Sequence, residues 1–155
     1  MLYLVLAILS GLVGGLTIAI MPQVRNRIRN IIVLFFCALG TFFTWKAVLL
    51  VFAGKNIGIA GELAGFSWSF GIDPLGGVFG LIASSLWIFA AVYSFGYMDG
   101  KHKQRTYYTF FLMAFSVTLG VAFSGSLLVL YLFYELLTFV TYPLVIHERN
   151  SEAVK

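Results

Sequence analysis

Residues 126–147 read Ser126-LLVLYLFYELLTFVTYPLVI-His147 and form the longest unbroken apolar stretch of the chain. About 20 apolar residues are enough to cross the hydrocarbon core of a bilayer. Glu135 lies near the middle of this stretch, at a depth where a charged group costs about 2.5 to 3.5 kcal/mol. The stretch therefore predicts a membrane-spanning helix, and we expect its one carboxylate to have a function.

The composition of the whole chain indicates the same surroundings. Hydrophobic residues make up 61% of the 155 residues and charged residues 10%, whereas an average soluble domain has about 25% charged residues. The net charge of +4 would suggest nucleic acid as a partner of a soluble protein, but the basic residues gather in short loops between apolar stretches. The chain is therefore predicted to be an integral membrane protein in contact with lipid, and no nucleic-acid partner is expected.

Five stretches are long enough to span a bilayer. We expect them to form the helices of one membrane domain, residues 1–155, at about 2–21, 31–53, 74–98, 106–124 and 126–147. The first stretch lacks the features of a cleaved signal peptide and is expected to remain as an anchor. If the spans alternate, eight of the ten Lys and Arg residues lie on one side. The positive-inside rule then predicts a multi-pass protein of the cell membrane, with its N-terminus outside and its C-terminus inside.

One long loop, residues 54–73, separates the second and third predicted spans. Its segment Phe66-Ser67-Trp68-Ser69-Phe70-Gly71-Ile72 alternates between apolar and small residues, which is the period of a β-strand. Ile57-Gly58-Ile59 could supply the antiparallel partner, so a short hairpin on the outer face is predicted. The alternative is an interfacial loop whose Phe and Trp side chains lie among lipid headgroups.

Hydroxyl groups are predicted on the same helical face as Glu135. Tyr131, Thr138 and Tyr142 lie four residues before it, three after it and seven after it, and these spacings bring side chains to one side of a helix. A carboxylate at membrane depth with hydroxyls above and below it is typical of a proton relay. The alternative is a protonated structural glutamic acid that donates one interhelical hydrogen bond.

Three further residues are candidates for accessory roles. Pro143 removes a backbone hydrogen bond to Phe139, so a helix kink is expected there. His147 lies at the predicted inner end of the span, where an imidazole suits proton collection, although a boundary position explains it as well. Lys46 is the second charged residue within a predicted span, and snorkelling to the outer interface is favoured over pairing with Glu135.

Familiar catalytic and cofactor motifs are missing from the sequence. It has no phosphate-binding glycine loop, no dinucleotide fingerprint and no Cys-x-x-Cys, and it has one cysteine, Cys37, and two histidines. No cofactor and no metal are therefore expected, and the chain is not expected to catalyse a bond change by itself.

Two long stretches resemble a known family. They are Phe70-GIDPLGGVFGLIASSLWIFAAVYSFGYM and Tyr107-YTFFLMAFSVTLGVAFSGSLLVLYLFYELLTFVTYPLVIH. Both are similar to the antiporter-like membrane subunits of multisubunit monovalent cation/proton antiporters, respiratory complex I and membrane-bound hydrogenases, and most of all to the D-type antiporter subunit. The most specific runs are Tyr93 to Met98 and Phe133 to Thr138. The resemblance implies that Glu135 is the family's fifth-helix glutamate, which pairs with a lysine to drive proton movement.

Family members have many more spans than this chain, and by the resemblance their paired lysine follows the point where it stops. The expectation is therefore the N-terminal piece of a split subunit or a truncated product, with the lysine supplied by another membrane subunit of a hetero-oligomeric complex. The function expected is a part of an H⁺ or Na⁺/H⁺ translocating module, with Glu135 as the titrating site of a proton half-channel. The alternative is a non-conducting structural or assembly subunit, and a small oligomeric channel is a third hypothesis.

Overall fold

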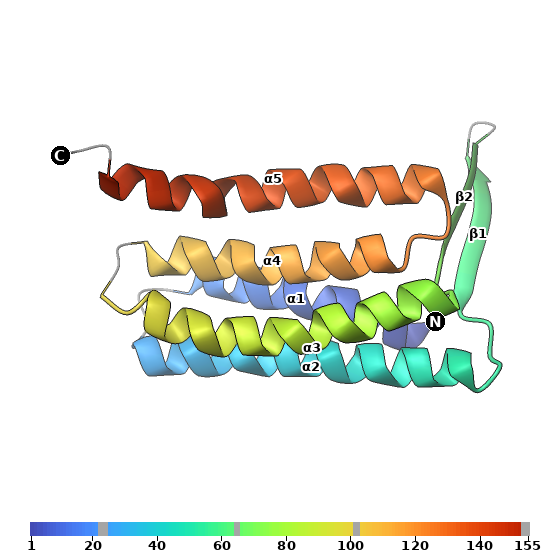
Figure 1. Cartoon of the computed structure of the whole chain (residues 1–155), viewed down its shortest axis with the longest axis horizontal. Helices are drawn as coiled ribbons and strands as arrows, with labels where there is room; N and C mark the ends of the chain where they lie inside the picture. Colours follow the sequence, from blue (N-terminus) through green and yellow to red (C-terminus); the bar gives the residue numbers. More distant parts are fainter. Residues whose placement is uncertain (22–24, 64–65, 101–102, 153–155) are drawn as a thin grey trace.

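The computed structural model describes residues 1–21, 25–63, 66–100 and 103–152, with side chains except at residues 63 and 66 and after residue 144 (Figure 1). The elements follow in the order α1 (Leu2–Ile20), α2 (Asn26–Phe52), β1 (Gly58–Leu63), β2 (Phe66–Gly71), α3 (Pro74–Tyr97), α4 (Gln104–Ala122) and α5 (Leu127–Glu152). The five helices run alongside one another, with the N-terminus and the hairpin at one end of the bundle and the C-terminus at the other (Figure 1). A mostly helical membrane fold with a small antiparallel sheet, as predicted, is confirmed.

The helices begin and end close to the predicted spans, with two clear differences. α5 continues to Glu152, five residues beyond the predicted end at residue 147. α2 begins at Asn26, five residues before the predicted start at residue 31, so the basic segment that was expected as a loop forms the first turn of the helix. Arg, Asn and Ile all tolerate helical backbone, and hydropathy marks only the apolar part of a helix. The basic residues of this segment therefore project from a helix end.

Four helices of the described residues are long and apolar enough to cross a membrane, namely α1, α2, α3 and the part of α5 from Leu127 to Leu144. α4 has the same length as α1, but its first two turns carry Gln104 and Arg105 and then a run of hydroxyl residues from Thr106 to Thr109. These polar residues lower its average hydropathy. A multi-pass membrane protein is thus supported, whereas the fifth span is not established by length and composition.

α4 lies at the centre of the bundle and packs against α1, α5, α3 and α2. Its core residues include Phe115, 1% exposed, and Leu112 and Leu119, which are fully buried. Gly11 and Gly15 of α1 allow close approach, because a Cβ at Gly11 would lie 2.7 Å from the Leu112 carbonyl oxygen. Small residues thus let α1 and α4 touch through their backbones.

The predicted hairpin is present, with β1 and β2 antiparallel and Ile59 opposite Phe70. It is fixed to the connection between α4 and α5 by backbone hydrogen bonds. Gly71 N donates to Phe123 O at 2.8 Å, and Gly125 N donates to Ser69 O at 3.0 Å. The Asp73 carboxylate then accepts from Gly76 N at 2.9 Å and caps α3, as expected for an N-cap aspartate before Pro74.

Candidate functional site

α5 is packed on one side only. Val129 is 8% exposed and shares a helical face with Phe133, whose ring lies against Gly120 of α4 and stacks on Phe70 of β2 at 5.7 Å. Gly120 is needed for this contact, because a Cβ there would overlap the Phe133 ring. The face of α5 that carries Val129, Phe133 and Val140 is therefore its inner face.

The Glu135 stripe, defined as Tyr131, Glu135, Thr138 and Tyr142, lies on the other face. With about 3.6 residues per turn, Glu135 points roughly opposite to the inner face of α5. Tyr131 is 59% exposed and Tyr142 is 66% exposed, while Thr138 is exposed and Glu135 is half-buried. The stripe is thus directed away from the rest of this chain, where another protein segment or lipid must cover it.

The depth of Glu135 agrees with its position in the sequence. It lies eight residues after Leu127, where the apolar span begins, and nine before Leu144, the last residue of that span with a described side chain, which is about 12 Å and at least about 14 Å along the axis at about 1.5 Å per residue. A glutamate side chain is too short to reach either end. Its carboxyl group must therefore be satisfied at mid-span.

The described residues supply no such partner. None of their side chains forms a hydrogen bond or an ion pair with Glu135. The nearby Thr138 hydroxyl donates to the Tyr134 carbonyl at 3.2 Å, so its proton is directed to its own helix and its oxygen remains an acceptor. Within this part of the chain, the carboxyl group and the hydroxyls share a face without contacting one another through a direct hydrogen bond.

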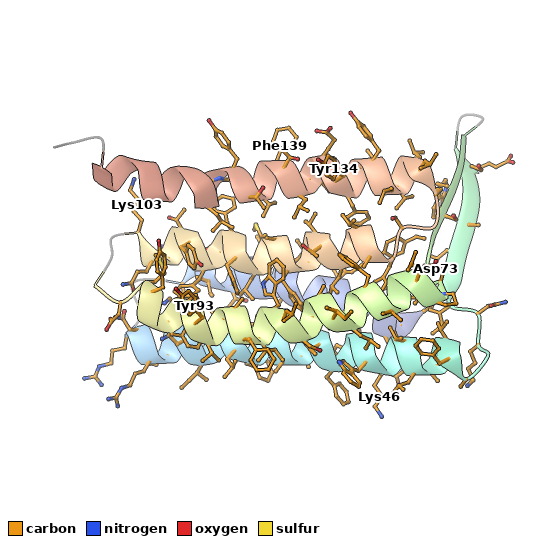
Figure 2. The ribbon with its side chains drawn as sticks, viewed as in Figure 1. Lys46, Asp73, Tyr93, Lys103, Tyr134 and Phe139 are labelled. Carbon is orange, nitrogen blue, oxygen red and sulfur yellow. The ribbon has the colours of Figure 1, made fainter. Side chains whose placement is uncertain are left out.

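Lys46 is not placed to complete the site. It lies on α2, is exposed, and its ammonium group is 5.7 Å from the centre of the Phe42 ring. Figure 2 shows Lys46 pointing away from the bundle on the side of α2, whereas Tyr134 and Phe139 mark α5 on the opposite side. The structure therefore does not bring Lys46 and Glu135 together.

The remaining predicted residues lie toward the C-terminal end of α5. Pro143 is inside the helix, which continues to Glu152, and the Thr141 hydroxyl donates to Leu137 O at 2.8 Å one turn earlier. His147 belongs to the same helix, but its side chain lies outside the described residues. The kink at Pro143 and the accessory role of His147 stay predictions.

One feature of the site region has no signal in the sequence. A cavity of about 370 Å³ lies between three segments that are far apart in the chain, namely α1, the hairpin and α5. Its lining is entirely apolar and includes Val5, Trp68 and Leu132. Glu135 is not among its lining residues. Among the described residues, no group of three His, Cys, Asp or Glu could hold a metal ion.

Comparison with known proteins shows which proteins this chain is similar to. No protein-family model matches the chain. It is 30% identical over 89 residues to Na(+)/H(+) antiporter subunit A1 of Staphylococcus aureus, in strain bovine RF122 / ET3-1 and in strain JH9, and the match covers 57% of this chain and 11% of each relative. The chain thus spans about a tenth of the length of these relatives.

A solved structure shows the same fold. A chain of the membrane-bound sulfane sulfur reductase, an archaeal respiratory membrane complex, superposes with a TM-score of 0.72 and 24% sequence identity, over 88% of this chain and 21% of that one. The curated relatives carry the name subunit A1, and the resemblance to the D-type subunit stays a prediction. The wider prediction is confirmed: this chain is homologous to part of an Na(+)/H(+) antiporter subunit and has the fold of a chain of a respiratory membrane complex.

Proposed function

We propose that this chain forms part of an antiporter-like module that moves H⁺, or exchanges Na⁺ for H⁺, across the cell membrane, with Glu135 as a titrating site. One observation carries the proposal. The carboxyl group is at mid-span on the face of α5 that is turned away from the bundle, and it has no cation among the described residues. Because a charge at this depth costs about 2.5 to 3.5 kcal/mol, a partner from outside this part of the chain is needed.

The partner that fits is a lysine of another membrane subunit. An opposite charge within about 4–6 Å favours the ionised carboxylate, and its withdrawal favours proton uptake. A lysine that approaches and leaves would therefore switch Glu135 between binding and releasing a proton. Tyr131, Thr138 and Tyr142 supply hydroxyls along the same face, which with water would carry the proton along the helix.

All five helices span the membrane in this proposal. α4 has the length of α1 and runs alongside the four apolar helices from one end of the bundle to the other (Figure 1). Its polar first turns then lie at the end where Arg25 and Lys103 also lie. By the positive-inside rule this end faces the cytoplasm, so the N-terminus and the hairpin lie outside, and Lys46 snorkels to the outer interface.

The test is Glu135→Gln in the assembled complex, because the amide keeps the shape of the side chain and cannot titrate. A positioned proton-transfer group typically contributes about 10²–10⁴-fold to a rate. We therefore expect the variant to lower proton or sodium flux in proteoliposomes by at least about tenfold. The subunit composition of the complex should not change. Glu62→Gln is the matched control, since Glu62 is an exposed carboxylate of the hairpin and its loss should leave flux unchanged.

A structural or assembly role is the second candidate function. The exposed face of α5 also presents Leu132, Leu136 and Phe139, which are 53%, 48% and 71% exposed, and such a surface can hold a neighbouring helix. In that case Glu135→Gln would release subunits from the complex and leave the flux of the remaining intact complexes normal. Normal flux in a fully assembled variant would reject the relay.

A further inference from the structure

The end of the bundle opposite the hairpin carries a basic cluster, defined as Arg25, Arg27, Arg29, Lys103 and Arg105. Asp99 is the one carboxylate that the described side chains place at this end, just after α3. The hairpin end has Lys55 against Glu62 and Asp73. The positive charge of the described residues is therefore strongly concentrated at one end.

The cluster brings the first turns of two helices together. The guanidinium carbon of Arg29 lies 4.7 Å from the centre of the Tyr108 ring, so the start of α2 adjoins the start of α4. Arg25 is the N-cap residue just before α2, four residues ahead of Arg29, and Arg105 is nearly one turn before Tyr108 on α4. The geometry thus directs Arg25, Arg29 and Arg105 to one region at the edge of the bundle.

Among the described side chains, Asp99 is the one anion at this end against the five cations of the cluster. Neither α2 nor α4 has an acidic residue in its first turn, and their N-cap residues, Arg25 and Lys103, make no side-chain cap hydrogen bond. Cations at a helix N-terminus oppose the helix dipole, which favours anions there. Arg29 donates to Asn26 Oδ1 at 3.2 Å and to Asn30 Oδ1 at 3.1 Å, yet its Nε is buried without a partner among the described residues. The cluster therefore carries a surplus of positive charge, which an anion at the membrane surface would offset.

We propose that the basic cluster binds the phosphate headgroup of an acidic phospholipid. The apolar spans of α2 and α3 end beside the cluster, so the anion that meets it is a lipid headgroup at the membrane surface. Arginine recognises phosphate oxygens through paired N–H donors, and clusters of Lys and Arg next to a membrane span attract acidic lipids. The bound lipid would offset the repulsion between the starts of α2 and α4.

The experiment counts bound lipid on the purified chain by native mass spectrometry, with phosphatidylglycerol and phosphatidylcholine as probes. We expect phosphatidylglycerol to bind at least about twentyfold more tightly, and Arg25→Gln/Arg105→Gln to weaken it about 25-fold, since each cation near the surface contributes about fivefold. Both residues are exposed, so their replacement should not unfold the bundle. Lys46→Gln/Lys55→Gln removes the same charge elsewhere and should change the affinity less than about twofold.

A second measurement needs no variant. Raising the salt concentration from about 0.05 to about 0.5 M should weaken phosphatidylglycerol binding to the wild-type chain at least about tenfold, because salt screens exposed charges. Equal binding of the two lipids, no salt dependence, or the same loss in the Lys46/Lys55 variant would overturn the proposal. Displacement of the lipid by millimolar inorganic phosphate would also overturn it, because the site would then be one for free anions.

Discussion

α4 and α5 are neighbours in sequence and in space, yet they meet their surroundings in different ways. α4 is covered on nearly all sides, and two of its hydroxyls are bonded to other helices. Tyr108 Oη donates to Ser94 O of α3 at 3.1 Å, and the Ser116 hydroxyl donates to Ile8 O of α1. α5 packs along α4 and touches β2, and only 6% of its apolar span is buried. The more apolar of the two helices is the less covered one.

In a membrane protein, exposed apolar residues can face lipid, whereas exposed polar groups at mid-span need another partner. In α3, the exposed residues Leu75, Phe79, Leu86 and Phe89 are apolar, which suits lipid. α5 exposes apolar residues too, but with the Glu135 carboxyl group and the hydroxyls of Tyr131, Tyr134 and Tyr142 among them, and lipid cannot satisfy these groups. Uncovered polar groups at mid-span therefore point to a missing protein neighbour.

The largest expected effect is a difference in unfolding free energy between replacing a buried ring of α4 and an exposed ring of α5. Phe115→Ala removes a ring that is 1% exposed at the centre of the bundle, so we expect the free energy of unfolding in detergent to fall by about 3–5 kcal/mol. Phe139→Ala on α5 is the matched control, because that ring is 71% exposed, and surface replacements change stability by about 0.5 kcal/mol or less. Similar losses for both would remove the distinction between covered and uncovered helices.

A smaller effect is expected at the contact between the two helices. Gly120→Val pushes a side chain into the Phe133 ring, and overpacking of this kind costs about 1–3 kcal/mol. Gly96→Val on α3 is the control, because nothing lies within 4 Å of a Cβ added there. Thermal unfolding of both variants in the same detergent measures the difference. An unchanged midpoint for Gly120→Val would mean that α5 does not pack on α4 through this ring.

Much of the fold could be predicted from the sequence because its signals are local. Apolar length gives the helices, and the alternation in Phe66 to Ile72 gives β2. The partner strand could be predicted only near Ile57–Ile59, while β1 covers Gly58–Leu63, because Gly61 and Glu62 carry no strand signal of their own. The bond from Gly125 to Ser69 joins distant segments, and no local pattern encodes it.

The candidate site could be predicted in its composition but not in its direction. Spacing alone places Tyr131, Glu135 and Thr138 on one face of a helix. Which face packs inward depends on Gly120 and Phe133 meeting across two helices, and hydropathy cannot distinguish a lipid-facing surface from one that another helix covers. The outward direction of the stripe is therefore a structural finding that the sequence does not contain.

The most direct test of the proposed relay is a structure of the native assembly, with the distance measured from the Glu135 carboxyl group to the nearest cation. We predict a lysine ammonium of another subunit within about 4–6 Å, or linked to the carboxyl group by ordered water, with Tyr131 and Thr138 facing the same water-filled space. A Glu135 carboxyl group surrounded only by hydrocarbon, or by helices without a cation and without water, would contradict this prediction.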